Sequence, residues 1–109
     1  MEGPIAHVNR QPFLSNDLYV DPAGYQVKLG QREIDLSLKE FNLLYLLISH
    51  KGKVVRRSEI LQAVSVAELV NEEGALNVMI CRLRKKIESF PHQPKRIVLV
   101  RGLGYRFKG

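Results

Sequence analysis

The sequence has only one cysteine, Cys81, and no apolar run that approaches the length of a membrane span. One cysteine cannot close an internal disulfide, which excludes a disulfide-rich secreted scaffold and favours a reducing compartment. A helix that crosses a bilayer needs ~20 apolar residues, and the most apolar stretch, residues 41–48, is much shorter. Residues 1–4 also lack the charged-then-apolar layout of a secretory signal. We therefore expect a cytoplasmic protein that has no membrane as a partner.

Residue patterns for catalysis and for cofactor binding are missing as well. The histidines His7, His50 and His92 lie far apart, and no cysteine or carboxylate spacing joins them into a metal site. Serine, histidine and aspartate occur without a nucleophile elbow or a triad signature, and the glycines of residues 101–104 fit a hairpin rather than a phosphate loop. We expect no enzyme activity, no metal and no cofactor.

The length of 109 residues suits one compact domain with one hydrophobic core. Hydrophobic residues make up 45% of the chain and charged residues 26%, which is ordinary for a globular protein and argues against disorder. Residues 1–12 contain two prolines and show no periodicity. We interpret them as a linker and place the domain at residues 13–109.

Acidic residues are scarce in the C-terminal quarter of the chain. From Cys81 to Gly109 there are nine Lys or Arg residues against one acid, Glu88, whereas residues 1–80 carry eight basic and ten acidic side chains. This asymmetry predicts an electropositive surface that suits a polyanion such as nucleic acid.

The order of predicted elements indicates an α+β fold. Alternating apolar and polar residues, with turn residues between them, predict a small antiparallel sheet near the N-terminus. A capping box from Ser37 to Glu40 predicts a helix that runs to about His50, and a second helix is expected from Arg57 or Ser58 to about Val64. The predicted strands are residues 13–14, 18–20, 25–29, 32–36, 97–100 and 105–107, with a short extended piece at 54–55.

A further helix, at about residues 72–88, is the most informative element. At about 100° per residue its apolar side chains fall on one stripe and its basic side chains on the opposite face. Such a helix suits the major groove of DNA, and the alternative is an ordinary solvated surface helix. The buried stripe is predicted to hold Leu76, Ile80, Leu83 and Ile87, and the opposite face Val78, Cys81, Arg82 and Lys85.

Three segments, in this order and at this spacing, resemble the winged-helix effector domain of OmpR/PhoB-type response regulators. They are residues 37–44 (SLKEFNLL), 82–87 (RLRKKI) and 100–107 (VRGLGYRF). The resemblance implies a winged helix-turn-helix with an N-terminal four-stranded antiparallel sheet, three helices and a C-terminal β-hairpin wing. It also implies sequence-specific binding to double-stranded DNA, with the helix at about 72–88 in the major groove and the wing at about 97–107 at the minor groove.

Four basic residues are predicted to contact DNA. Arg82 lies on the groove face, where it can form a bidentate bond with guanine or hold a phosphate, and both alternatives stay open. Arg84 lies to one side, so we expect it to clamp a phosphate. Lys85 adds long-range attraction or is only a solvated charge. Arg101 occupies the wing position of the family, where a basic side chain uses the negative potential of a narrow minor groove.

Three uncharged residues complete the predicted DNA-binding site. Asn77 stands where the family often has Asp, and its amide can bind adenine or only cap the helix locally. Val78 can touch a thymine methyl group. Cys81 is interpreted as a small residue that lets the backbone approach DNA, and a redox switch at its thiol is the alternative.

Four departures from the family pattern predict weaker DNA binding. Gly74 and Ala75 stand where the family often has Arg and Thr, Ser65 replaces a Trp, and Leu99 replaces a Thr. Each lost cation should flatten the salt dependence of binding by roughly one unit of slope.

The resemblance also implies the partners of the domain. It implies promoter DNA, in direct repeats, bound by a head-to-tail homodimer, and a contact between RNA polymerase and the loop at residues 65–73. The domain would then be the effector part of a two-component response regulator. The alternative function is a winged-helix protein-interaction module, for RNA polymerase or a partner regulator, with weak or nonspecific DNA binding.

Overall fold

The computed structural model describes residues 11–64 and 73–109. They form two compact units, one that ends at Asp35 and one that spans Leu36–Gly109. The linker predicted at residues 1–12 lies almost wholly outside the described residues. The loop at residues 65–73, predicted to contact RNA polymerase, also lies almost wholly outside them. The domain limits of 13–109 therefore stay a prediction.

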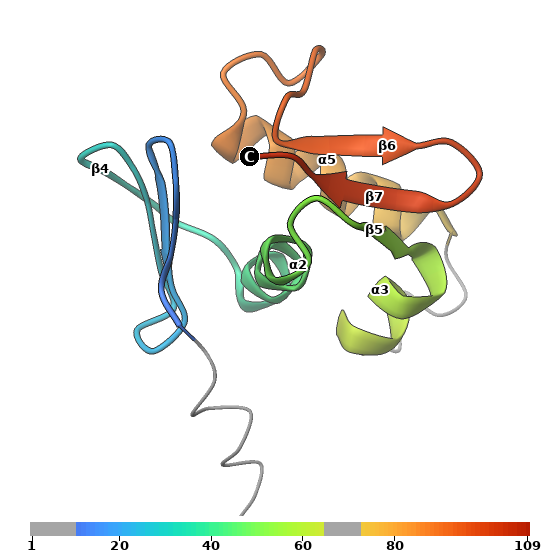
Figure 1. Ribbon diagram of the computed structural model, residues 1–109, viewed down its shortest axis with the longest axis horizontal. Helices are drawn as coiled ribbons and strands as arrows, with labels where there is room; N and C mark the ends of the chain where they lie inside the picture. Colours follow the sequence, from blue (N-terminus) through green and yellow to red (C-terminus); the bar gives the residue numbers. More distant parts are fainter. Residues whose placement is uncertain (1–10, 65–72) are drawn as a thin grey trace, which may run out of the picture. The chain divides into compact units, whose positions relative to one another are not determined.

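The N-terminal unit is the four-stranded antiparallel sheet that the sequence predicted. Its strands are β1 (Phe13–Ser15), β2 (Leu18–Asp21), β3 (Gln26–Leu29) and β4 (Arg32–Ile34), paired in the order β1-β2-β3-β4 (Figure 1). Leu18 and Val20 are buried along β2 and Val27 is buried in β3, where it pairs with Val20. Residues two apart share one face of a strand, so these three side chains define the apolar face of the sheet.

The turn between β2 and β3 corrects two predicted strand boundaries. The sequence predicted a strand from Tyr25, but this residue has φ of 51°, in the left-handed region, so β3 begins one residue later. The turn is closed by Asp21, whose Oδ1 accepts from the amide of Ala23 at 3.0 Å. In the register of β3 and β4, Leu36 would face Tyr25. Since Tyr25 has left the strand, β4 ends at Ile34 rather than at Leu36.

Helix α2 (Leu38–Ser49) begins at the predicted capping box. Ser37 Oγ accepts from the amide of Glu40 at 3.1 Å, and Glu40 Oε1 accepts from the amide of Ser37 at 3.0 Å. These bonds satisfy two amides that the first turn leaves without helical partners. The helix buries a wide apolar stripe that forms the centre of the second unit: Phe41, Leu43, Leu44, Leu47 and Ile48.

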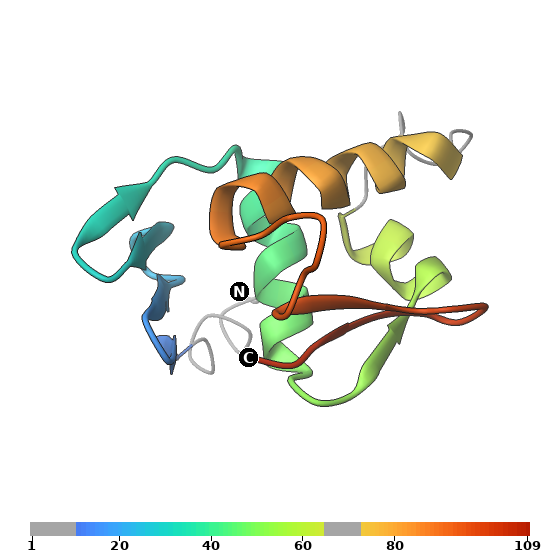
Figure 2. The same cartoon turned by 90° about the horizontal axis from the view of Figure 1, so that it is seen from above.

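The second unit packs helices around α2 and against a small sheet (Figures 1 and 2). Helix α2 contacts α3 (Arg57–Val64), α5 (Glu73–Ile87) and strand β7 (Gly104–Phe107). The C-terminal hairpin of β6 (Ile97–Val100) and β7 confirms the predicted wing. Strand β5 (Val54–Arg56) adds to it, and the sheet order is β5-β7-β6. The sequence predicted the extended piece at 54–55 but not its pairing with the wing.

Two glycines of the wing have different tasks. Gly102, in the turn, has φ of 82°, a conformation that side-chain-bearing residues rarely adopt. Gly104 is needed for space, because a Cβ placed there would lie 2.1 Å from the carbonyl oxygen of Val55 and 2.9 Å from the Cα of Arg56. The close approach of β7 to β5 therefore depends on the missing side chain at Gly104.

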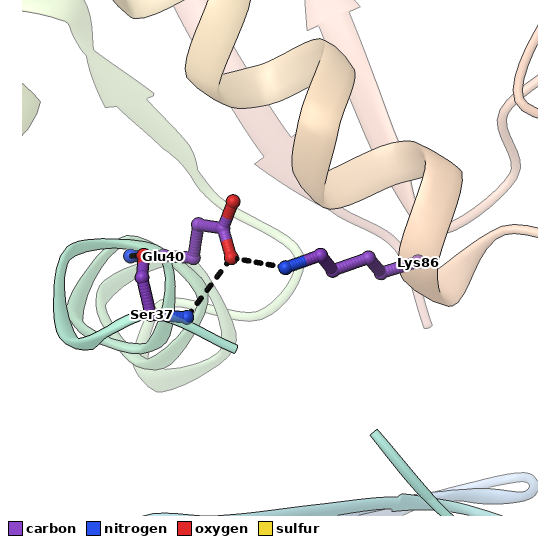
Figure 3. A network of polar contacts seen from close by, with 3 residues as sticks. All are labelled: Ser37, Glu40 and Lys86. Atoms are coloured by element: carbon purple, nitrogen blue, oxygen red, sulfur yellow. Dashed lines mark hydrogen bonds and ion pairs between the residues drawn. The ribbon is translucent and has the colours of Figure 1, made fainter. Parts of the chain in front are cut away.

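The capping box also joins α2 to α5 (Figure 3). Lys86, in the last turn of α5, donates to Glu40 Oε1 at 2.7 Å. Burial raises the pKa of Glu40, but the hydrogen bonds from Lys86 and the Ser37 backbone, together with the Lys86 charge, outweigh burial and hold the pKa below its ordinary value. Because the folded pKa is lowered, this carboxylate stabilises the fold above its ordinary pKa, and that contribution is lost as pH falls through the folded pKa.

Replacing Lys86 by alanine should therefore lower the melting temperature at neutral pH, by the equivalent of about 1 kcal/mol. The difference from the wild type should shrink in acid, where Glu40 is protonated and no longer attracts the ammonium group. Thermal unfolding at pH 7 and at a series of pH values below the ordinary pKa of a glutamate measures both effects. Lys85→Ala is the matched control, because Lys85 is exposed. If the two variants melt alike at pH 7, the ion pair does not stabilise the fold.

Candidate nucleic-acid interface

Helix α5 has one buried and one exposed face, as the sequence predicted. Leu76, Ile80, Leu83 and Ile87 are each at most 1% exposed, and Met79 is buried beside them. We call the opposite side the outer face of α5. It consists of five exposed residues: Asn77, Val78, Cys81, Arg82 and Lys85. The predicted division of the helix is confirmed, while the contacts of these residues with DNA stay predictions.

The charge on the outer face is of one sign. No acidic residue occurs from Gly74 to Ile87. Within the described part of the chain, neither Arg82 nor Lys85 has a side-chain hydrogen bond or ion pair. Their donors are therefore available to an external anion or to base edges.

The wing carries a further exposed cation. Arg101 lies in the turn between β6 and β7, and the described residues offer no partner to its guanidinium group. Leu99 and Leu103 beside it are 51% and 44% exposed. The turn thus combines one free guanidinium group with apolar side chains.

Arg84 lies at the side of the outer face and is bound within the fold. Its Nε and one terminal nitrogen donate to the carbonyl oxygen of Ile97 at 3.1 and 2.9 Å, and its guanidinium carbon lies 5.8 Å from the centre of the Tyr105 ring. The side chain is only partly exposed. Arg84 therefore ties α5 to both strands of the wing, while its contact with a DNA phosphate stays a prediction.

Asn77 is exposed, but its amide oxygen already has partners. Oδ1 accepts from the hydroxyl of Tyr105 at 3.1 Å and from a terminal nitrogen of Arg57 at 3.4 Å. Tyr105 is buried in β7, and Arg57 begins α3. Three elements therefore meet at this one side chain. The hydrogen bond from Tyr105 to Asn77 was not predicted from the sequence. A tyrosine in a predicted strand does not indicate which residue its hydroxyl group will contact.

Glu88 was also missed as a structural residue. Its carboxylate is 8% exposed and accepts from three backbone amides, those of Lys95, Arg96 and Ile97, at 2.8 to 3.1 Å. Arg96 in turn donates to the carbonyl oxygen of Ile87 at the end of α5. These bonds fix the chain between α5 and β6. The surplus of basic residues in the sequence therefore overstates the surface charge, since Arg84, Lys86 and Arg96 bind within the fold.

Three of the four family departures lie in the part of the chain that the structure describes, and Ala75, in α5, is half-buried. Gly74 is exposed in the first turn of α5, and a Cβ placed there would meet nothing within 4 Å. Leu99 is exposed on β6.

In residues 11–64 and 73–109, no helix has the length and apolar character that a membrane span requires. In the same residues, no three metal-ligating side chains lie close enough together to hold a metal ion.

Comparison with known proteins identifies the family that shares this arrangement. The family described as "Transcriptional regulatory protein, C terminal" matches residues 31–107, which is most of the chain. The chain belongs to this family. It is an effector domain of the OmpR/PhoB type, and the family regulates transcription rather than catalysing a reaction.

Individual members of the OmpR/PhoB family agree with this assignment. The sensory transduction protein RegX3 of Mycobacterium tuberculosis is 38% identical over 95 residues, which cover 87% of this chain and 42% of that protein. This chain thus spans less than half of its curated relative. The RstA DNA-binding domain of Klebsiella pneumoniae, in complex with RstA box, superposes with a TM-score of 0.81 at 32% identity, over 90% of this chain and 97% of that one. DrrB of Thermotoga maritima, an OmpR/PhoB homolog, gives 0.85 at 32% identity, over 96% of this chain and 48% of that one.

Proposed function

We propose that this effector domain binds specific double-stranded DNA sequences, with α5 in the major groove and the wing at the minor groove. The observation that carries the proposal is the outer face of α5, which is exposed, lacks acids and has Arg82 and Lys85 without internal partners. Arg101 adds a second point of positive charge on the wing turn. The RstA domain, which has the same fold, was solved in complex with RstA box, and this supports DNA as the ligand.

The roles of the contact residues follow from their chemistry. Arg82 lies mid-helix, where a guanidinium group can bind guanine O6 and N7 or a phosphate. Val78 offers an apolar contact for a thymine methyl group. Cys81 is small enough to let the backbone approach the duplex, and Lys85 and Arg101 add attraction to phosphates. Arg84 holds the wing to α5 and so positions both binding elements.

The wider setting is proposed on the family resemblance. The domain would act in the cytoplasm as the output part of a two-component response regulator, on promoter direct repeats and as a head-to-tail homodimer. The proposed contact between RNA polymerase and residues 65–73 involves a segment almost wholly outside the described residues. The alternative function, a protein-interaction module, depends on that same loop.

Arg82→Ala and Arg101→Ala should each weaken DNA binding without unfolding the domain. A target duplex is first selected from a random pool at a stated salt concentration, and affinity is then titrated by fluorescence anisotropy. Loss of a base contact by Arg82 should cost about 5- to 100-fold. Loss of a phosphate contact should lower the salt slope by roughly one unit.

Lys53→Ala is the matched control for these variants, because Lys53 is an exposed cation in the turn before β5, outside α5 and the wing. It removes the same charge and should change affinity much less. Unchanged binding by both arginine variants, or an equal loss for Lys53→Ala, would contradict the proposed interface.

Gly74→Arg should strengthen DNA binding. The site is open, its backbone is helical, and arginine is the residue that the family often has there. The new cation should steepen the salt slope by roughly one unit. Gly74→Ala separates this effect from helix stability, since it should stabilise α5 by up to about 1 kcal/mol and leave the salt slope unchanged. Equal salt slopes for the two variants would show that the first turn of α5 does not reach a phosphate.

A further inference from the structure

The amide of Asn77 has a defined orientation. Arg57 can only donate hydrogen bonds, so the Asn77 atom that faces it at 3.4 Å must be the carbonyl oxygen. The Tyr105 hydroxyl lies 3.1 Å from the same oxygen and donates to it. A carbonyl oxygen has two lone pairs, and two donors occupy both of them. The amino group of Asn77 is therefore the end of the amide that neither Tyr105 nor Arg57 holds.

Tyr105 is itself held firmly. Its ring is only 4% exposed, it pairs with Val55 of β5 and Leu99 of β6, and the Arg84 guanidinium group lies over it. Arg84 is fixed in turn by two hydrogen bonds to Ile97. The hydroxyl of Tyr105 therefore has a fixed position, and its hydrogen bond to Oδ1 sets the orientation of the Asn77 amide.

This orientation restricts which bases Asn77 can bind. The bidentate pairing of asparagine with adenine needs Oδ1 to accept from N6 while Nδ2 donates to N7. Here Oδ1 is occupied, so only the donor remains. A lone donor matches N7, which adenine and guanine share, and also guanine O6 and thymine O4, so it does not select adenine as the bidentate pairing does.

We propose that Asn77 acts as a donor-only contact to a base acceptor in the major groove, and that Tyr105 and Arg57 are the positioning residues that prevent an adenine-specific pairing. The proposal rests on the proposed function, because it assumes that α5 lies in the major groove. It also explains what asparagine changes relative to the Asp that the family often has. An aspartate held by the same two donors would offer an acceptor to the groove instead of a donor.

The positioning is tested first without DNA. In the 109-residue chain, the side-chain NH₂ resonances of Asn77 are followed by ¹⁵N NMR in the wild type and in Tyr105→Phe. We expect Tyr105→Phe to shift these resonances while the fold is kept. Tyr19→Phe, which removes a hydroxyl from β2, should leave them unchanged. Asn77 resonances that do not respond to Tyr105→Phe would overturn the positioning role.

The base preference is tested by selecting bound duplexes from a randomised pool at fixed salt. Wild type should accept adenine and guanine under Asn77 within about twofold and should disfavour cytosine, whose major-groove edge offers only a donor. Asn77→Ala should lose this discrimination against cytosine. Tyr105→Phe combined with Arg57→Ala frees Oδ1 and should favour adenine over guanine by about fivefold or more. Asn77→Asp should shift the preference toward cytosine, whose N4 donates.

An adenine preference of about fivefold or more in the wild type that disappears in Asn77→Ala would overturn the donor-only contact. So would a double variant with the wild-type base preference. Failure of the wild type to select any duplex would overturn the proposed function and the base contact with it. In that case the NMR response to Tyr105→Phe still decides whether Tyr105 positions Asn77, so the two failures are distinguishable.

Discussion

Replacing Gly104 by alanine is expected to push strand β7 away from β5 and to lower the free energy of unfolding by about 3 kcal/mol or more. The added methyl group would lie 2.1 Å from the carbonyl oxygen of Val55. Its obstacles are backbone atoms on β5, so no side-chain rotation relieves the clash. The strand pairing of Arg56 with Gly104 must then open. Because β7 is the middle strand, β5 loses its partner and the wing loses its support.

Urea unfolding followed by circular dichroism measures the loss, and an anisotropy titration measures the accompanying loss of DNA affinity. Gly24→Ala is the matched control, because a Cβ there meets only the Asp21 carboxylate, at 3.8 Å. It should be close to neutral. A Gly104→Ala variant as stable as Gly24→Ala would mean that β7 does not approach β5 as closely as described.

Replacing Glu88 by alanine should also destabilise the fold by about 3 kcal/mol or more, since three amides lose their acceptor at about 1–3 kcal/mol each. The amide of Ile97 begins β6, so the start of the wing should loosen with it. Glu88→Gln keeps one oxygen but turns an amino group toward amide donors, and it should also be destabilised, though less than Glu88→Ala.

Ser89→Ala, at the exposed neighbouring position, is the control and should be close to neutral. Urea unfolding measures the free energy of unfolding of the three variants and ranks them by stability. Equal stability of Glu88→Ala and Ser89→Ala would show that the carboxylate is not needed to hold residues 95–97.

The elements that local patterns specify were predictable from the sequence. The start of α2 follows from Ser37 and Glu40 alone, because a capping box is a local arrangement of four residues. The buried stripe of α5 follows from helical spacing, since each side chain's face is fixed by its position in the turn. The exposed position of Arg82 follows from the same geometry.

Features that depend on distant parts of the chain were not predictable. The pairing of β5 with β7 joins segments about 50 residues apart in sequence, and nothing in the short 54–56 stretch indicates its partner. The left-handed conformation of Tyr25 could not be expected, because the neighbouring glycine is the usual residue for it.

The exposed face of the predicted site follows from helical spacing, but the internal partners of its side chains do not. Helical spacing places Arg84 at the edge of the outer face. Its side chain donates hydrogen bonds to the carbonyl oxygen of Ile97, which only the tertiary fold brings near. Asn77 is on the exposed side as predicted, yet its chemistry depends on Tyr105 of the wing. Glu88 was noted only as the single acid of a basic segment, because its amide partners lie in the following loop.

The position of β7 between β5 and β6 has a consequence for synthesis on the ribosome. Neither outer strand has a partner until residues 104–107 emerge from the exit tunnel, and the side of α2 that β7 contacts stays uncovered until then. We therefore expect this unit to complete its folding only after residues 104–107 have emerged, and nascent chains stalled before Gly104 to be more sensitive to proteases and more prone to aggregate.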